Sequence, residues 1–324
     1  MQPLALTMGE PGGVGGELAL KAWETPSVPA FFMVGDPDWL SRIDMAVPIR
    51  SIDHPSDAVR VFPAALPILP LPLSVPVEPG MADPRHAPTV IASIERAVAA
   101  VHRGEASAVV TLPIQKESLI SAGFPHPGHT EFLAALTGTR RSVMMLVCKD
   151  LRTVPMTVHI PLSEVPYQLT TGLVEETARI VADALRADFG IIAPRLALAG
   201  LNPHAGEEGA LGKEEGAMLV PAAAKLRREG IDISGPLPAD TLFHSEARTH
   251  YDVVLCAYHD QALIPAKMLD FYNAVNVTLG LPIVRTSPDH GTALNIVGTG
   301  RARPDSLIAA LKLARDMAER RQSV

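Results

Sequence analysis

Three histidines in this sequence occupy the same kind of position. His159 ends a short apolar run, and His204 and His259 each closely follow another such run. Runs of this kind are typical of buried strands, and in open α/β sheets ligands bind beyond the carboxyl ends of the strands. Imidazole is a common ligand of divalent metals, so three histidines at that edge could hold one ion and leave coordination positions open for a substrate.

Two acidic residues accompany the histidines. Asp260 directly follows His259 and could orient a metal ligand or act as an outer partner of the ion. Asp240 lies in a loop that could return to the same edge, although an aspartate before a threonine could equally cap a helix. A lone histidine at a strand end is more often a structural residue, and no short ligand motif links these three.

Three further positions could bind an anion. His129 and Thr130 stand at an expected helix start, where free backbone N–H groups favour a phosphate, although Thr130 could instead be a simple N-cap. Arg285 ends an apolar run, where its guanidinium could grip a carboxylate or phosphate with two hydrogen bonds. Lys267 lies in an apolar stretch and is either a functional cation or a snorkelling side chain. Because the net charge is −7, an anionic substrate would need such local cations.

The glycine-rich segment 9–16 fails the tests for both common nucleotide-binding motifs. A P-loop needs Lys and Ser or Thr after its last glycine, but Glu17 follows Gly16. A dinucleotide fingerprint would need a third glycine where Leu18 stands. The segment therefore predicts a tight strand-to-helix turn near an active site. The polar, glycine-punctuated segment 285–298, between a strand and a helix, is the strongest functional signal.

The elements that must position these residues alternate between strand-like and helix-like patterns. This alternation predicts an α/β fold with a largely parallel sheet. The expected strands are 4–8, 31–34, 108–112, 143–147 and 154–158, and the expected helices are 17–23, 90–101, 173–185, 214–228 and 304–320. The proline-rich segment 45–88 is expected to form edge strands and loops.

The bulk properties set limits on domains, partners and location. The chain has 324 residues, too many for most single cores, so two domains are expected. The acidic balance argues against a nucleic-acid binder. Cys148 and Cys256 lie in apolar stretches and are expected to be buried, reduced thiols. No apolar run has the form of a signal peptide or a membrane span, so we expect a cytoplasmic protein without a membrane partner.

Six segments together resemble the 4-hydroxythreonine-4-phosphate dehydrogenase family of pyridoxal phosphate biosynthesis. They are 128–131, 200–206, 235–243, 258–261, 275–282 and 285–298. The family is similar in fold to isocitrate and isopropylmalate dehydrogenases, which have two α/β domains with a cleft between them and lack the usual Rossmann fingerprint. The resemblance implies a cofactor-side domain at 1–125 plus 275–324. It also implies a domain at 126–274 for metal, substrate and dimerisation.

The resemblance also implies the roles of individual residues. The metal ligands would be His159, His204 and His259, holding one zinc, cobalt or magnesium ion in active sites shared by a homodimer. The substrate would contact His129, Thr130, Lys267, Asn276 and Arg285, and the cofactor, NAD or NADP, would contact His290, Gly291, Thr292, Ala293 and Asn295. The catalytic candidates are Asp240, Asp260 or a bound water as the base that takes the proton of the substrate hydroxyl, and Lys267, which with Arg285 would hold carboxylate or phosphate.

The sequence departs from the family pattern at three positions. Glu10 stands where the family usually has Asp, and Gly16 where it usually has Pro. Asn295 stands where related NAD-preferring dehydrogenases place an acidic residue against the adenosine ribose. A neutral side chain there repels a 2′-phosphate less, which leaves the choice between NAD and NADP open.

The implied reaction is the oxidation of 4-phosphohydroxy-L-threonine to a 2-amino-3-oxo acid, which decarboxylates to 3-amino-2-oxopropyl phosphate. Two alternatives use the same histidines. One is a related metal-dependent dehydrogenase acting on a cyclic dihydrodiol dicarboxylate, and the other is a metal-dependent hydrolase. The hydrolase would not need the segment 290–293.

Overall fold

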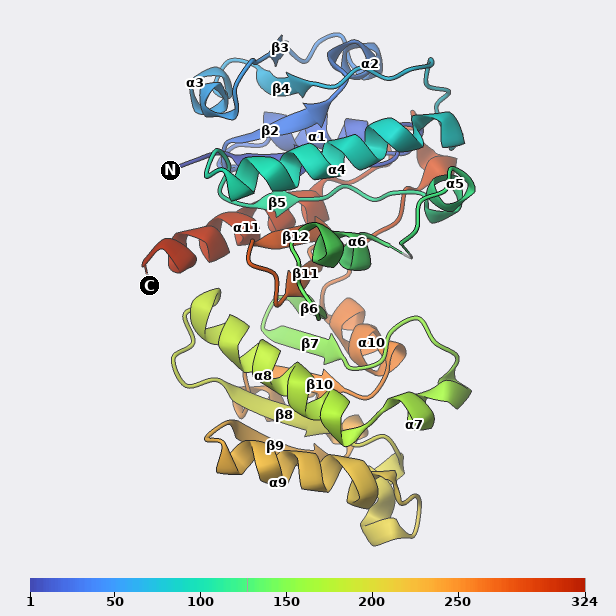
Figure 1. Ribbon diagram of the computed structural model, residues 1–324, viewed down its shortest axis with the longest axis vertical. Helices are drawn as coiled ribbons and strands as arrows, with labels where there is room; N and C mark the ends of the chain where they lie inside the picture. Colours follow the sequence, from blue (N-terminus) through green and yellow to red (C-terminus); the bar gives the residue numbers. More distant parts are fainter. Residues whose placement is uncertain (127, 324) are drawn as a thin grey trace. The chain divides into compact units, whose positions relative to one another are not determined.

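A computed structural model describes residues 1–126 and 128–323 of the chain (Figure 1). The chain divides into two compact units. Unit 1 combines Met1–Arg140 with Leu281–Gln322, and the body of unit 2 is Arg141–Gly280. The sequence had placed these boundaries at 125/126 and 274/275.

Unit 1 is built on an all-parallel sheet with the order β3-β4-β2-β1-β5-β12. Its strands are β1 (Leu4–Thr7), β2 (Phe31–Gly35), β3 (Ile49–Ser51), β4 (Leu66–Pro70), β5 (Val109–Val110) and β12 (Arg285–Pro288). The residues of β1 and β2 are all buried, as expected for strands covered on both faces. Because β12 lies beside β5, the C-terminal segment completes the sheet begun by the N-terminal one.

Among the described residues of unit 1, seven α-helices connect and cover this sheet. They are α1 (Gly15–Glu24), α2 (Pro37–Ile43), α3 (Ala58–Val61), α4 (Ala87–His102), α5 (Lys116–Ser121), α6 (His129–Leu136) and α11 (Asp305–Ser323). Helix α4 packs on β1 and β2, as Figure 1 shows, and its apolar side follows the spacing expected for residues 90–101.

Helix α6 belongs to unit 1, whereas the sequence placed it in the second domain. Phe132 and Leu133 of α6, together with Phe124, are buried in the core that α4 covers. The rings of Phe124 and Phe132 meet edge to face, with centroids 4.9 Å apart. This packing moves the boundary beyond residue 126, and no local sequence pattern shows it.

Unit 2 has a mixed sheet with the order β11-β6-β7-β10-β8-β9. Its strands are β6 (Val143–Cys148), β7 (Leu151–Pro155), β8 (Arg195–Ala199), β9 (Asp232–Leu237), β10 (Val253–Cys256) and β11 (Val275–Leu279). Four neighbours, β7, β10, β8 and β9, are parallel, whereas β6 is antiparallel to β7 and β11. The two-residue turn Lys149-Asp150, with Lys149 at φ 42°, makes β6 and β7 a hairpin.

The α-helices of unit 2 are α7 (Val165–Gln168), α8 (Thr171–Ala187), α9 (Val220–Arg228) and α10 (His259–Leu269). A π-helical turn, η5 (Glu215–Leu219), leads into α9, where the sequence predicted one continuous helix from 214. In the described part of the chain, no helix combines the length and apolar character needed to cross a membrane.

Candidate active-site residues

The three histidines of the proposed metal site follow three neighbouring strands of unit 2. Strand β10 lies between β7 and β8 and is parallel to both. The carboxyl ends of these strands therefore meet at one edge of the sheet. His159 follows β7, His204 follows β8, and His259 begins α10 directly after β10.

His159 and His259 lie close to each other. Their ring centroids are 5.6 Å apart, and the ring planes are tilted by 42°. Two imidazoles on one zinc ion, with Zn–N bonds of about 2.1 Å, place their centroids roughly 5–6 Å apart. The Nδ1 atom of His259 lies 2.7 Å from Oδ1 of Asp260, which leaves Nε2 to face an ion. The pair fits half of a zinc site.

His204 lies at the same edge of the sheet but on an unusual loop. Within η4 (Pro203–Gly209), the five residues 204–208 all have positive φ angles, between 43° and 80°. The side chain of His204 is exposed, with Nδ1 3.7 Å from Oε2 of Glu207. Within residues 1–126 and 128–323, no three His, Cys, Asp or Glu side chains are grouped as a metal site. One chain thus brings together two of the three predicted ligands.

The other predicted residues of unit 2 have distinct settings. Asp240 is exposed in the short turn η6 (Ala239–Thr241), after β9, at the same sheet edge as the histidines; no side chain caps this turn. Lys267 is half-buried on α10, with Nζ 5.7 Å from the centroid of the Phe271 ring. It lies two helical turns beyond His259, about 12 Å along the axis. Asn276 is on β11, and its buried Oδ1 atom has no hydrogen-bond partner in the described structure.

Arg285 is the most deeply buried cation among the predicted site residues. It is 3% exposed at the start of β12, and its Nη2 and Nε atoms lie 2.6 and 3.2 Å from Oγ1 of Thr111, after β5. Burial lowers the pKa of Arg285 to about 10, so the guanidinium stays charged at neutral pH. A buried charge is costly unless a counter-charge or strong acceptor meets it, which makes this position suited to an anion.

His129 begins α6 and lies in the field of two cations. Its Nε2 atom is buried without a hydrogen-bond partner in the described structure. Burial, followed by the charges of Arg285 and Lys116, holds the pKa of His129 well below its ordinary value, so the ring is neutral at pH 7. The N-cap of α6 is Gly128 and not Thr130, which corrects the alternative reading of Thr130. Pro127, before the cap, lies outside the described residues.

The predicted cofactor segment is held by the glycine-rich turn and by α1. The N–H of Val14 donates to the carbonyl of Thr292 at 3.0 Å. A Cβ atom on Gly13 would come within 2.7 Å of that carbonyl oxygen, so a glycine is needed there. The N–H of Gly298 donates to Oε1 of Glu17 at 2.6 Å. The turn 9–16 therefore supports the segment 290–298, a role that the failed nucleotide motifs did not indicate.

Three residues of the predicted cofactor segment have distinct local settings. Ala293 has φ 48°, in the left-handed region, and Asn295 is exposed. The Nδ1 atom of His290 lies 2.9 Å from the carbonyl oxygen of Gly291. The exposed Asn295 side chain is available to a ligand, as a ribose contact requires.

The two departures in the turn 9–16 have local explanations. Glu10 is 3% exposed and accepts a hydrogen bond from the N–H of Gly12 at 3.3 Å. Burial, the largest cause, raises the pKa of Glu10 to about 7. Gly16 packs tightly against α2: a Cβ atom there would lie 2.4 Å from Cδ1 of Ile43 and 3.0 Å from the ring of Trp39.

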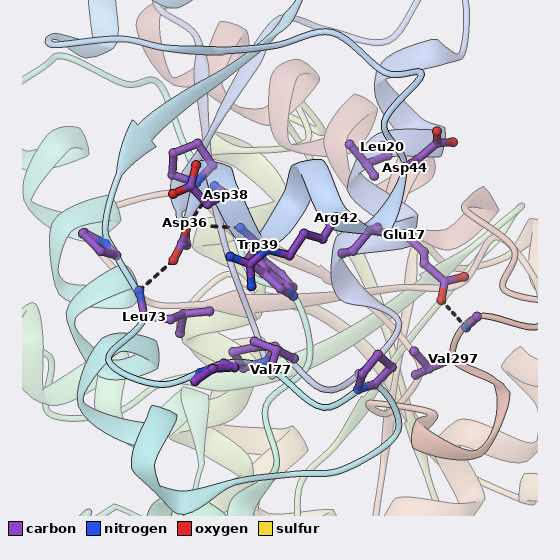
Figure 2. Close-up of a pocket in the computed structure, with 18 of the residues that line it drawn as sticks. Glu17, Leu20, Asp36, Asp38, Trp39, Arg42, Asp44, Leu73, Val77 and Val297 are labelled. Carbon is purple, nitrogen blue, oxygen red and sulfur yellow. Dashed lines mark hydrogen bonds between the residues drawn. The ribbon is translucent and has the colours of Figure 1, made fainter.

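A cavity of about 780 Å³ adjoins this loop in unit 1 (Figure 2). Its walls are α1, α2 and the segments 70–79 and 297–300. Five carboxylates line it, Glu17, Glu24, Asp36, Asp38 and Asp44, against two cations, Lys21 and Arg42. Figure 2 shows Asp36 bonded to the backbone of Leu73 and Glu17 bonded to the loop beside Val297. This acidic excess makes the cavity a poor phosphate site.

Residues 27–314 match the family model described as pyridoxal phosphate biosynthetic protein PdxA. The chain belongs to this family. A curated relative, the 4-hydroxythreonine-4-phosphate dehydrogenase of Methylorubrum populi, is 56% identical over 98% of this chain and 95% of its own length. The family prediction and the α/β fold prediction made from the sequence are confirmed.

Solved structures of the PdxA family have the same fold. The 4-hydroxythreonine-4-phosphate dehydrogenase of Klebsiella pneumoniae matches with a TM-score of 0.89 and 37% identity, covering 98% of this chain and 100% of that one. A terephthalate 1,2-cis-dihydrodiol dehydrogenase of Burkholderia xenovorans matches less closely. Its TM-score is 0.66 at 27% identity, over 97% of this chain and 98% of that one.

Sequence reasoning missed several supporting residues of this PdxA-family chain. Thr111, Glu17 and Gln261 each bond to a segment far away in the sequence. Thr111 is a polar residue inside an expected strand, and Glu17 is an acid at the start of an apolar helix. A polar residue in such a position signals a supporting role. The partners of Thr111 and Glu17 are set by the tertiary fold and could not be read from the sequence.

Proposed function

We propose that this protein oxidises 4-phosphohydroxy-L-threonine with NAD or NADP in pyridoxal 5′-phosphate biosynthesis. The product, a 2-amino-3-oxo acid, loses carbon dioxide to give 3-amino-2-oxopropyl phosphate. The observation that carries this proposal is the buried Arg285–Thr111 pair beside a neutral His129, in a chain of the PdxA family. It is a setting for an anionic group of a small substrate.

In this proposal His159 and His259 hold a divalent metal, with His204 as a third ligand. When bound, the ion supplies Lewis acidity that lowers the pKa of the substrate hydroxyl. The imidazole set favours zinc or cobalt over magnesium, which prefers oxygen ligands. Because one chain groups only two of the three histidines among its described residues, a homodimer that contributes ligands from both chains suits the site.

The surroundings of the two aspartates assign them different roles. Asp260 already lies within hydrogen-bond distance of Nδ1 of His259, so its role is to fix the orientation of that ring. Asp240 is exposed at the same sheet edge, and its carboxylate is the group proposed to take the proton of the substrate hydroxyl. Lys267 and Asn276 then hold the carboxylate and amine side of the substrate.

The phosphate of the substrate is assigned to Arg285, His129 and Thr130. Arg285 supplies a permanent charge, and the start of α6 at His129 and Thr130 supplies backbone N–H groups. A neutral His129 contributes a hydrogen bond and not a second charge. The cofactor is assigned to the segment 290–293 with Asn295, whose neutral side chain is compatible with either NAD or NADP.

A turnover assay tests this proposal. Purified protein supplied with zinc or cobalt is expected to reduce NAD or NADP when given 4-phosphohydroxy-L-threonine. It is expected to be inactive with 4-hydroxythreonine and with a cyclic dihydrodiol dicarboxylate. Turnover of the dihydrodiol alone would favour the second dehydrogenase, whose relative shares the fold. The absence of any NAD or NADP binding in calorimetry would favour the hydrolase.

A further inference from the structure

The three histidine-bearing loops of unit 2 are tied together through the backbone of one residue, Ala257, and the side chain of another, Gln261. The carbonyl of Ala257, between β10 and α10, accepts a hydrogen bond from Oγ1 of Thr157 at 2.7 Å. Thr157 stands two residues before His159. The N–H of the same Ala257 donates to Oε1 of Gln261 at 2.6 Å. The backbone of Ala257 therefore couples the loop of His159 to the first turn of α10 through both its carbonyl and its N–H.

Gln261 extends the connection to the third loop. Its Nε2 donates to the carbonyl of Gly200 at 2.8 Å, directly after β8 and four residues before His204. The amide thus uses its acceptor on the segment that carries His259 and its donor on the segment that leads to His204. Such a bridge needs both functions of a primary amide, because a carboxylate in its place would accept but not donate.

The loop that Gln261 holds is a strained one. Residues 204–208 all lie in the left-handed region, and four of the five are not glycine. Such conformations are unfavourable for residues other than glycine and persist only where the surroundings impose them. The buried carboxylate of Glu215 accepts bonds from the N–H and Nδ2 of Asn202, at 2.7 and 3.0 Å. The chain is thus fixed at Gly200 and again at Asn202, both before the strained residues 204–208.

We propose that Gln261 is a positioning residue that fixes the loop carrying His204 at its edge of the sheet through its two amide hydrogen bonds. The inference rests on the proposed metal site. Gln261 touches neither metal nor substrate in this assignment. Its contribution is to fix where the loop of His204 leaves the sheet.

The test is Co²⁺ binding to the full-length protein. The Gln261→Glu variant keeps the acceptor for Ala257 but replaces the donor to Gly200 with a second oxygen. Co²⁺ affinity is expected to fall about 10- to 100-fold, as for other partners that orient metal ligands. The visible absorption of bound Co²⁺, which reports coordination geometry, is expected to change. Gln168→Glu, at the exposed end of α7, introduces the same charge and is expected to behave as the wild type.

Folding and metal binding are separated by two further measurements. Gln261→Met, of similar length, removes both bonds without adding charge, and thermal unfolding of the metal-free variants reports their stability. Unchanged Co²⁺ affinity and spectrum in both Gln261 variants would overturn the inference. If the wild type bound no Co²⁺, the metal proposal would fall. Hydrogen exchange of residues 201–209 would then decide: faster exchange in Gln261→Glu supports the positioning role, and unchanged exchange refutes it.

Discussion

Replacing Glu17 tests whether the segment 290–298 binds the cofactor. The Glu17 carboxylate, 9% exposed on α1, accepts the N–H of Gly298 at 2.6 Å. A hydrogen bond to a charged group contributes about 1.5–3 kcal/mol to stability. In Glu17→Ala, water can reach the N–H of the exposed Gly298 and replace part of this bond, so we expect the ordered loop to lose about 1–2 kcal/mol. If this bond orders the loop for the cofactor, Glu17→Ala raises KM for NAD or NADP about 5- to 30-fold.

The assay separates KM for the cofactor from kcat. We expect Glu17→Ala to raise KM with little change in kcat, because the bond orders the loop before and during the reaction alike. Glu17→Gln keeps an acceptor and is expected to recover most of the loss. Glu24, two helical turns further along α1 and exposed, provides the matched control Glu24→Ala. Hydrogen exchange of residues 290–302 reports the loop itself. A loosened loop with unchanged KM would refute the cofactor assignment.

Three more predictions concern unit 1. Thr111→Val removes the hydroxyl that Arg285 contacts. The KM for the substrate is expected to rise, and inhibition by inorganic phosphate is expected to weaken in the same proportion. An unaltered KM would exclude an anion at this pair. The pKa of Glu10 is raised from 4.5 to about 7, so the free energy of unfolding falls as pH rises between these values. Chemical denaturation is expected to show Glu10→Gln more stable than the wild type at pH 8, with the difference shrinking toward pH 5. Gly16→Ala is expected to cost about 1 kcal/mol or more by crowding α2, whereas Gly172→Ala, with open space around it, is expected to be neutral or stabilising in the same denaturation series.

Local sequence patterns predicted the individual strands and helices whose residues are buried on a regular spacing. The apolar runs before His159, His204 and His259 placed all three after strands, and the pairing of those strands puts their ends at one edge. The helical spacing in 90–101 and 173–185 predicted α4 and α8, since each buries one face.

Contacts between distant segments lay beyond such patterns. Thr111 and Arg285 meet across 174 residues because β12 lies beside β5, a pairing that no single strand encodes. The position of α6 depends on how Phe132 packs under α4. The positive φ angles at 204–208 carry no glycine signature except at Gly206, so the strained loop was not foreseen.

The division of unit 1 into two stretches has a consequence for synthesis on the ribosome. The body of unit 2 is one uninterrupted segment, so its sheet can form as soon as residue 280 has emerged. Unit 1 must wait for β12, the last strand made. Until then β5 is paired on one side only, with β1, and Thr111 lacks Arg285. The proposed anion pair is therefore among the last contacts to form. A chain truncated after Gly280 is expected to expose that strand edge and aggregate, and a soluble, monomeric truncation would contradict this order.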